Sequence, residues 1–239
     1  MKVLKIKAYQ PFACYRKPMN YNLWDTYPLP PLSTIKGWFH SVIKAKEYIP
    51  LSISIQGTYA AIVYDMQTLL KFDRIRRDEK QIIMDWIGKA LISSPTFIAT
   101  LLDVDLIIYI YSESKESLDA FRDNILKEDF PSIGRHEDLA RIDFVDFVDL
   151  EEAKFDVRNA HDLTYGIYLS KETALKYGLG GINYRMNTKY VIKSNLRYFE
   201  KVDVVYVDNG RIDKGNFLFD KEDNRIVELI NLESKNDNC

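Results

Sequence analysis

Cysteine and histidine are scarce in this sequence of 239 residues. The two cysteines, Cys14 and Cys239, lie far apart and lack the close spacing of zinc ligands. We therefore expect a reduced, cytoplasmic chain without a structural zinc. There are three histidines, with no H-E-x-x-H motif and no G-x-S-x-G elbow. The sequence thus predicts no metal, no cofactor and no activated nucleophile.

Long apolar runs are missing as well. No run approaches the roughly 18 residues that a membrane span needs. The first ten residues alternate lysine with apolar residues, unlike the continuous apolar segment of a signal peptide. The chain is 46% hydrophobic, enough for a core, and its length allows one large domain or two small ones. A net charge of −2 does not by itself indicate a nucleic-acid-binding protein.

The charges are nevertheless unevenly distributed along the chain. Residues 1–49 carry a net charge of +6, residues 143–156 carry −5 and residues 185–201 carry +4. Such partition suits a protein with one face on a polyanion and another face on protein or solvent. Ordinary solvated faces explain the same pattern and are favoured by composition alone.

Alternating apolar and polar residues predict strands, and apolar residues three to four positions apart predict helices. A first strand is expected over residues 3–10, followed by a loop rich in proline and tyrosine over 11–31. A helix should begin after Ser33, which is a good N-cap. The other predicted elements are a strand over 52–65 with its partner over 69–77, a short helix over 81–91, a long strand over 96–111 with a break near Asp103, a helix over 115–126 and a strand over 142–148.

Residues 3–64 and 96–148 thus both run strand, helix, strand. Two such units predict an α+β fold with a ferredoxin-like (RRM-type) sheet. The alternative, a doubly wound α/β domain, is disfavoured because no glycine-rich turn follows the first strand. We expect an RRM-like domain over residues 1–150 and a smaller β-rich C-terminal part over 151–239.

The segment from Tyr27 to Trp38 combines a proline-rich entry with a predicted helix start. Free backbone N–H groups and the helix dipole make such a start an anion site. Lys36 is unfavourable to the dipole but suits a phosphate, and Gly37 leaves room for a nucleotide or another backbone. An ordinary helix cap with a packing glycine explains these residues equally well.

A second candidate is the loop Pro131–Leu139. Arg135 could bind a phosphate in a forked geometry or hold Glu137 or Asp138 of its own loop. His136 is a candidate acid–base group, although a salt-bridged loop is the preferred interpretation of it.

Basic residues recur in two other places. Residues 71–77 are expected to form a hairpin arm whose arginines grip a nucleic-acid backbone or merely protect a sheet edge. These arginines are Arg74, Arg76 and Arg77. After the glycine cluster at 178–181, which lacks the spacing of a nucleotide-binding P-loop, four bases follow at intervals of four and can share a face. They are Arg185, Lys189, Lys193 and Arg197, and tyrosines for base stacking lie among them.

Three segments together resemble a known family. They are Phe12-Ala13-Cys14-Tyr15-Arg16-Lys17-Pro18, the stretch Tyr27-Pro28-Leu29-Pro30-Pro31-Leu32-Ser33-Thr34-Ile35-Lys36-Gly37, and the loop Ile133-Gly134-Arg135-His136-Glu137-Asp138-Leu139. The sequence resembles the Cas-five family, the subunit of type I CRISPR Cascade complexes that holds the 5′ handle of the guide RNA. The type I-B branch is the most similar, and the resemblance covers residues 3 to about 149.

The resemblance implies an RRM-like domain with a projecting β-hairpin thumb near residues 57–78, and a role in antiviral defence. Its partners would be the guide RNA, the backbone and large subunits of Cascade and, indirectly, target DNA. The handle site would include Ser33, Thr34, Lys36 and Gly37, with Tyr15, Arg16 and Lys17 as neighbours. The thumb would carry Arg74, Arg76 and Arg77, and the second motif would contribute Arg135 and His136.

Two interpretations of different class follow, with a third behind them. The preferred one is a non-catalytic RNA-binding subunit that uses charge and stacking. The alternative is a metal-independent endoribonuclease that cuts the CRISPR repeat, as one branch of the family does. Its candidate catalytic residues are His136, His40, Tyr15 and Lys36. A scaffold without RNA contact is the third interpretation.

Overall fold

The computed structural model describes residues 1–18, 23–76, 81–208 and 210–233. Its α-helices are α1 (Leu32–Val42), α2 (Lys115–Ile125) and α3 (Lys171–Tyr177). The strands of the first half are β1 (Lys2–Ala13), β2 (Leu23–Trp24), β3 (Ser52–Thr58), β4 (Ala61–Asp73), β5 (Ile82–Met84) and β6 (Lys89–Tyr111). Then follow β7 (Arg141–Asp149), β8 (Glu151–Phe155), β9 (His161–Leu163), β10 (Gly166–Ser170), β11 (Ile182–Lys193), β12 (Leu196–Val207), β13 (Gly210–Ile212), β14 (Gly215–Asp220), β15 (Arg225–Val227) and β16 (Ile230–Asn231).

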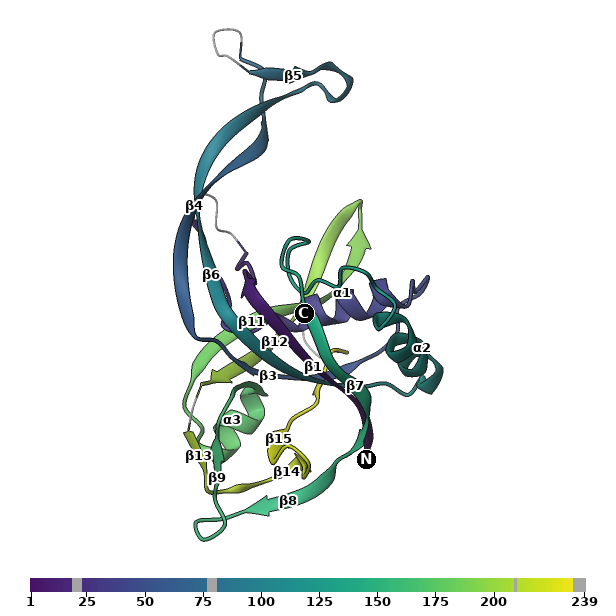
Figure 1. Cartoon of the computed structure of the whole chain (residues 1–239), viewed down its shortest axis with the longest axis vertical. Helices are drawn as coiled ribbons and strands as arrows, with labels where there is room; N and C mark the ends of the chain where they lie inside the picture. The colour runs from purple at the N-terminus through teal and green to yellow at the C-terminus, as the bar shows by residue number, and fades with distance from the viewer. Residues whose placement is uncertain (19–22, 77–80, 209, 234–239) are drawn as a thin grey trace.

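A predominantly antiparallel sheet forms the centre of the molecule (Figure 1). Its strands lie in the order β11-β12-β10-β3-β6-β1-β7, so strands from both ends of the sequence share one sheet. The predicted α+β class is confirmed, as are the first strand, the helix over 115–126 and the strand over 142–148. Among the described residues, no helix is long and apolar enough to cross a membrane.

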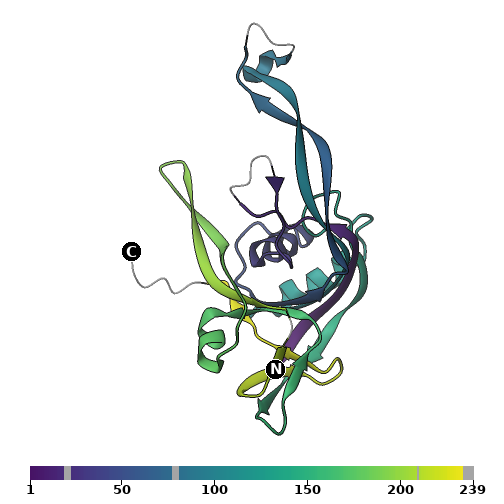
Figure 2. The same cartoon turned by 90° about the vertical axis from the view of Figure 1, so that its left-hand side faces the viewer.

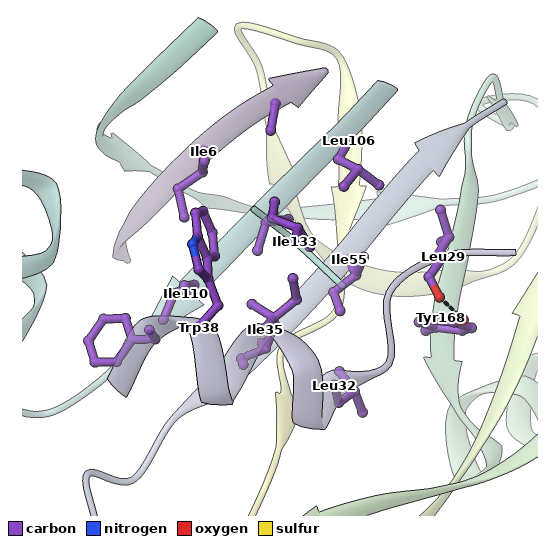
Figure 3. Close-up of a cluster of buried hydrophobic side chains, with 14 of the residues drawn as sticks. Ile6, Leu29, Leu32, Ile35, Trp38, Ile55, Leu106, Ile110, Ile133 and Tyr168 are labelled. Atoms are coloured by element: carbon purple, nitrogen blue, oxygen red, sulfur yellow. Dashed lines mark hydrogen bonds between the residues drawn. The ribbon is translucent and has the colours of Figure 1, made fainter. Parts of the chain in front are cut away.

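Alternation along the central strands divides the core between two faces. Leu4 and Ile6 of β1 and Leu106 of β6 point toward α1, where Ile35 and Trp38 cover them (Figure 3). On the opposite face, Val3, Ile107 and Tyr109 pack against β14 and β15. A hydrogen bond from the Tyr168 hydroxyl to the carbonyl of Leu29, 2.8 Å long, fastens β10 to the chain entering α1.

A buried charge joins the first strand to the C-terminal region. Lys5 is 1% exposed, and its Nζ lies 2.5 Å from Asp220 and 2.6 Å from Asp223. The Tyr109 hydroxyl donates a 2.9 Å hydrogen bond to the same Asp220 carboxylate. Buried charges are tolerated when they are paired and hydrogen-bonded in this way. The network therefore fixes the β14–β15 connection against the sheet.

A long hairpin, here called the arm, projects from the body and is made by β4 and the first half of β6 (Figures 1 and 2). Its pairing runs without interruption from Ala61–Leu102 to Asp73–Ala90. Asp103 has a φ of 50° where β6 passes from this partner to β3, but the expected break is absent, since β6 continues through it as one strand. The predicted pairing of 52–65 with 69–77 is wrong, because residues 61–73 form one strand that pairs with β6 instead.

The predicted helix over 81–91 is also wrong. These residues contain β5, a 3-10 turn over Asp85–Ile87 and the start of β6. A short isolated helix gains little from its own hydrogen bonds, whereas pairing with β4 and β5 satisfies the backbone of β6.

Strands β11 and β12 form a second projecting hairpin (Figure 2). Ser194 and Asn195 connect them, and both residues have left-handed backbone angles, with φ of 51° and 59°. Two such residues are typical of the tight turns that match the twist of antiparallel strands.

Candidate nucleic-acid interface

A pocket of about 590 Å³ lies where three separate parts of the chain meet. The loop after β1 contributes Arg16 and Lys17, the start of α1 contributes Ser33 and Thr34, and β11 contributes Arg185. These five residues are candidates from the sequence, and the fold brings them to one site. The rest of the lining is Pro18, Tyr27, Pro31, Met186, Asn187, Phe199 and Lys201.

The lining is positively charged. Of the described residues that form it, four are cationic and none is acidic. Lys17 Nζ is paired with Asp25 at 2.7 Å, and the Arg16 guanidinium lies 4.1 Å from the centroid of the Trp24 ring. Arg185 lies 3.7 Å from Asp203 but is 74% exposed, a geometry in which ion pairs contribute little. Arg185 is therefore accessible to an anion in the pocket.

The loop that carries Arg16 and Lys17 is held in place by backbone hydrogen bonds. Lys17 N–H donates to the carbonyl of Asp25 and Tyr27 N–H donates to that of Tyr15, both at 2.8 Å. Tyr15 itself is 2% exposed, and its hydroxyl donates to Gln10 Oε1 at 2.5 Å. Burial raises the pKa of Tyr15 well above its ordinary value. The Tyr15 side chain thus packs in the core under the loop, and it does not line the pocket.

Helix α1 presents its N-terminal end to this pocket. The expectation that Ser33 caps the helix is wrong, since α1 begins at Leu32 with Pro31 in the N-cap position and no side-chain cap. Leu32 is fully buried and anchors the first turn in the core. Because the first turn contains no acidic residue, the positive end of the helix dipole is left without a compensating side chain.

Lys36 points away from the pocket. Its Nζ donates a hydrogen bond to the carbonyl of Thr188 on β11, which ties α1 to that strand. Burial, followed by the charge of Lys189, lowers the pKa of Lys36. Lys189 in turn lies 3.5 Å from Glu200. Both predicted RNA contacts therefore have protein partners in this structure.

Gly37 faces a second hollow of about 380 Å³ between α1 and the loop after α2. A β-carbon at Gly37 would meet nothing within 4 Å, so protein packing does not require a glycine there. Ser33 and Thr34 border this hollow as well.

The loop Pro131–Leu139, here called the brace, is bonded through Asp138 to the segment after β1. Asp138 is fully buried and accepts hydrogen bonds from Arg135 Nη2 at 2.7 Å and from the backbone N–H of Cys14 at 3.0 Å. Arg135 thus holds Asp138, the intramolecular role that the sequence analysis left open. His136 is 98% exposed and lies 3.0 Å from Glu137.

His40 has a structural role in which its imidazole ring contacts the backbone at two points. Its Nδ1 lies 2.8 Å from the carbonyl of Lys36, and its Nε2 accepts a 2.9 Å hydrogen bond from the N–H of Ile49. Both ring nitrogens are thus engaged, and His40, His136 and Tyr15 are not brought together at one site.

The basic residues of the arm lie far from the pocket. Arg74 and Arg76 follow Asp73, the last residue of β4, which pairs with Ala90 at the outer end of the arm, and Arg76 lies 3.1 Å from Asp73. Arg77 lies outside the described residues.

The glycine cluster before β11 is explained locally. Gly178 is the left-handed C-cap of α3, and Gly181 lies so close to the Tyr206 backbone that a β-carbon would clash. The expected shared face of the four bases after it is wrong. A bulge near Lys189 and the turn after Lys193 interrupt the spacing.

Sequence reasoning missed Phe199 and Lys201 as pocket residues. The available signal was their alternation on one strand, positions 199 and 201, but it could not be used without knowing which face of β12 points inward.

A model of the family described as CRISPR-associated protein (Cas_Cas5) matches residues 3–85. No curated protein matches the sequence. The fold is similar to a chain solved as part of a CRISPR RNA-guided surveillance complex, with a TM-score of 0.54 and 13% identity over 87% of this chain and 91% of that one.

Two further solved chains are a CRISPR protein from Archaeoglobus fulgidus and a Cas protein. The first has a TM-score of 0.46 and 10% identity over 96% of this chain and 99% of that one. The second has a TM-score of 0.45 and 13% identity over 90% and 96%. The sequence match over residues 3–85 makes this protein similar to the CRISPR-associated Cas-five family, and it shares its fold with the surveillance-complex chain.

Proposed function

We propose that this protein is a non-catalytic, RNA-binding subunit of a CRISPR effector complex and that it holds the 5′ handle of the guide RNA. The observation that carries the proposal is the pocket in which Arg16, Lys17 and Arg185 meet the uncapped start of α1. Cations and free backbone N–H groups bind phosphates, and their convergence from three segments suits a bent single strand more than a straight duplex.

The fold supports the same proposal. Strands β3, β6, β1 and β7 lie side by side, with α1 following β1 and α2 following β6. In chain order this is the second, third, first and fourth strand of a βαββαβ unit, the arrangement of a ferredoxin-like or RRM-type domain. We assign this domain to residues 1–150, with the arm as its thumb and residues 151–239 as the smaller part. The type I-B branch remains the preferred subtype.

The neighbouring subunits would bind elsewhere on the molecule, with the arm as the main contact to the backbone subunits. Since the guide RNA and its complex act on nucleic acid inside the cell, we place the protein in the cytoplasm. The endoribonuclease alternative is less favoured because the buried Tyr15 hydroxyl is bonded to Gln10 and both ring nitrogens of His40 are engaged by the backbone.

The test is a binding and cleavage assay with labelled repeat RNA in the presence of EDTA. The wild-type chain should bind the RNA and leave it intact. Arg185→Ala should weaken binding and reduce the slope of affinity against salt by about 0.7, as expected for one lost phosphate contact on a single strand. His136→Ala should change neither binding nor RNA integrity.

Lys214→Ala is the matched control, since Lys214 is an exposed lysine between β13 and β14, outside the pocket. An equal loss of affinity in Lys214→Ala would mean that binding is unspecific. Specific cutting that His136→Ala abolishes would replace the proposal with the endoribonuclease.

A further inference from the structure

The β11–β12 hairpin extends one face of the pocket outward. Residues paired across antiparallel strands point to the same side, and so do residues two positions apart. Starting at the pocket, this side carries the pairs Arg185–Asp203, Asn187–Lys201, Tyr190–Phe199 and Ile192–Arg197. We call these residues the inner face of the hairpin.

The opposite side of the same hairpin carries different residues. It presents the pairs Val191–Tyr198 and Lys193–Leu196. Tyr198 is 50% exposed and Phe199 is 49% exposed, so two adjacent aromatic residues are equally accessible on opposite sides.

An aromatic pair occupies the middle of the inner face. The ring centroids of Tyr190 and Phe199 are 5.9 Å apart with an angle of 58° between the planes, and both side chains are about half exposed. The Arg197 guanidinium lies 4.7 Å from the Tyr190 centroid. Phe199 also lines the pocket, together with Lys201. The aromatic surface is therefore continuous with the cationic one.

We propose that Phe199 and Tyr190 form a stacking platform for unpaired bases of the RNA strand whose phosphates bind Arg185 and Lys201. This inference rests on the proposed function and adds to it a direction: the strand leaves the pocket along the inner face toward the tip of the hairpin. Stacking on aromatic rings is tolerant of sequence, because every base has a flat face.

The order of residues favours a nucleic acid over a protein segment. From Lys201 to Arg197, β12 advances four residues, or about 13 Å, with the aromatic pair between the two cations. An alternation of cation, aromatic ring and cation matches a strand that offers phosphates and bases in turn. The acid on this face, Asp203, lies at the pocket end, 3.8 Å from Lys171 and 3.7 Å from Arg185, and not among the aromatic residues.

The experiment compares two fluorescent RNA probes with equal numbers of phosphates. One is an oligoadenylate of about eight nucleotides, and the other is the same strand with abasic sites. Binding to the full chain is measured by anisotropy. Phe199→Ala should weaken oligoadenylate binding between about 5- and 100-fold and leave the abasic strand unchanged. Phe199→Trp should restore binding, and Lys201→Ala should weaken both probes alike.

Tyr198→Ala is the matched control, because it removes an equally exposed aromatic residue from the other side of the same strand. Thermal unfolding of each variant verifies that the hairpin mutants remain folded. Equal effects of Phe199→Ala and Tyr198→Ala, or equal loss on both probes, would overturn the stacking platform while leaving the proposed function intact.

Two other results have distinct meanings. If Phe199→Ala binds both probes normally but no longer assembles with the other subunits, the inner face is a protein interface and the inference is wrong. If the wild-type chain binds the labelled repeat RNA but neither probe, the stacking platform is wrong; if it does not bind the repeat RNA either, the proposed function itself fails.

Discussion

Two hairpins project from the body of this protein, and their exposed surfaces differ in chemistry. The arm carries an apolar stripe, since alternate residues of β4 and their neighbour on β6 point to one side. These residues are Tyr64, Met66, Leu70, Phe72 and Phe97, each more than half exposed. The opposite side of β4 carries polar residues such as Asp65, Gln67 and Lys71. The β11–β12 hairpin instead places aromatic rings among cations.

The difference in surface chemistry indicates that the two hairpins suit different kinds of partner. An exposed apolar stripe is typical of a surface that a protein partner covers and keeps dry. Rings between cations suit a charged strand that remains partly hydrated. From its arginines, the sequence predicted that the arm grips nucleic acid, yet Arg74 and Arg76 lie beyond the end of β4, at the outer end of the arm. The shaft between them and the body carries exposed apolar residues instead, which favours a protein partner.

The largest expected effect comes from removing the apolar stripe. In the triple variant Tyr64→Ser, Met66→Ser, Leu70→Ser, assembly with the other subunits should weaken by at least about 100-fold, because buried interface anchors each contribute about 2 kcal/mol or more. Affinity for RNA should stay within about twofold of wild type, a difference of under about 0.5 kcal/mol. Co-purification of the complex and RNA anisotropy measure the two effects separately.

The matched control for the arm is the double variant Asp65→Ser, Gln67→Ser on its other side. It should assemble normally. If the triple variant lost RNA affinity and kept assembly, the roles of the two hairpins would be reversed.

The next effect concerns the brace beneath the pocket. Asp138→Ala removes the buried partner of Arg135 and an acceptor for the N–H of Cys14. We expect the free energy of unfolding to fall by about 3 kcal/mol, as is usual when one member of a buried pair is removed. RNA affinity should fall too, because the adjacent Arg16 and Lys17 lose their support. Urea unfolding and anisotropy give the two values.

Glu137→Ala serves as the comparison for the brace. Glu137 also lies near Arg135, at 3.0 Å, but is 44% exposed, so its loss should cost less than about 1 kcal/mol. Equal destabilisation by the two variants would show that burial of Asp138 is not what stabilises the loop.

The sequence predicted the elements whose stability is local and missed those that depend on distant pairing. The first strand and the helix over 115–126 follow from their own apolar spacing. The start of β6 has no such local signal. It is a strand because it pairs with β4, and a short stretch of sequence does not show this pairing. The helix over 81–91 was predicted for that reason.

The same limit explains the candidate site. Arg16, Ser33 and Arg185 were each chosen from local patterns, and the sheet order then brought them together. The partner of Lys36 could not be foreseen from the sequence, because the Thr188 carbonyl lies 152 positions away. Phe199 was not predicted as a pocket residue. The side of the hairpin on which it lies depends on the bulge near Lys189 and the turn after Lys193, which the sequence does not show.

The smallest expected effect tests whether the turn sets the position of the inner face. Ser194 and Asn195 adopt left-handed angles that cost most residues about 1 kcal/mol each and cost glycine little. The double variant Ser194→Asn, Asn195→Gly should therefore stabilise the chain by about 0.5 to 1 kcal/mol and leave oligoadenylate affinity unchanged. A gain in stability with a loss of affinity would mean that the hairpin must bend to bind RNA. The platform would then form on binding, and the contrast with the arm would lie in flexibility as much as in surface chemistry.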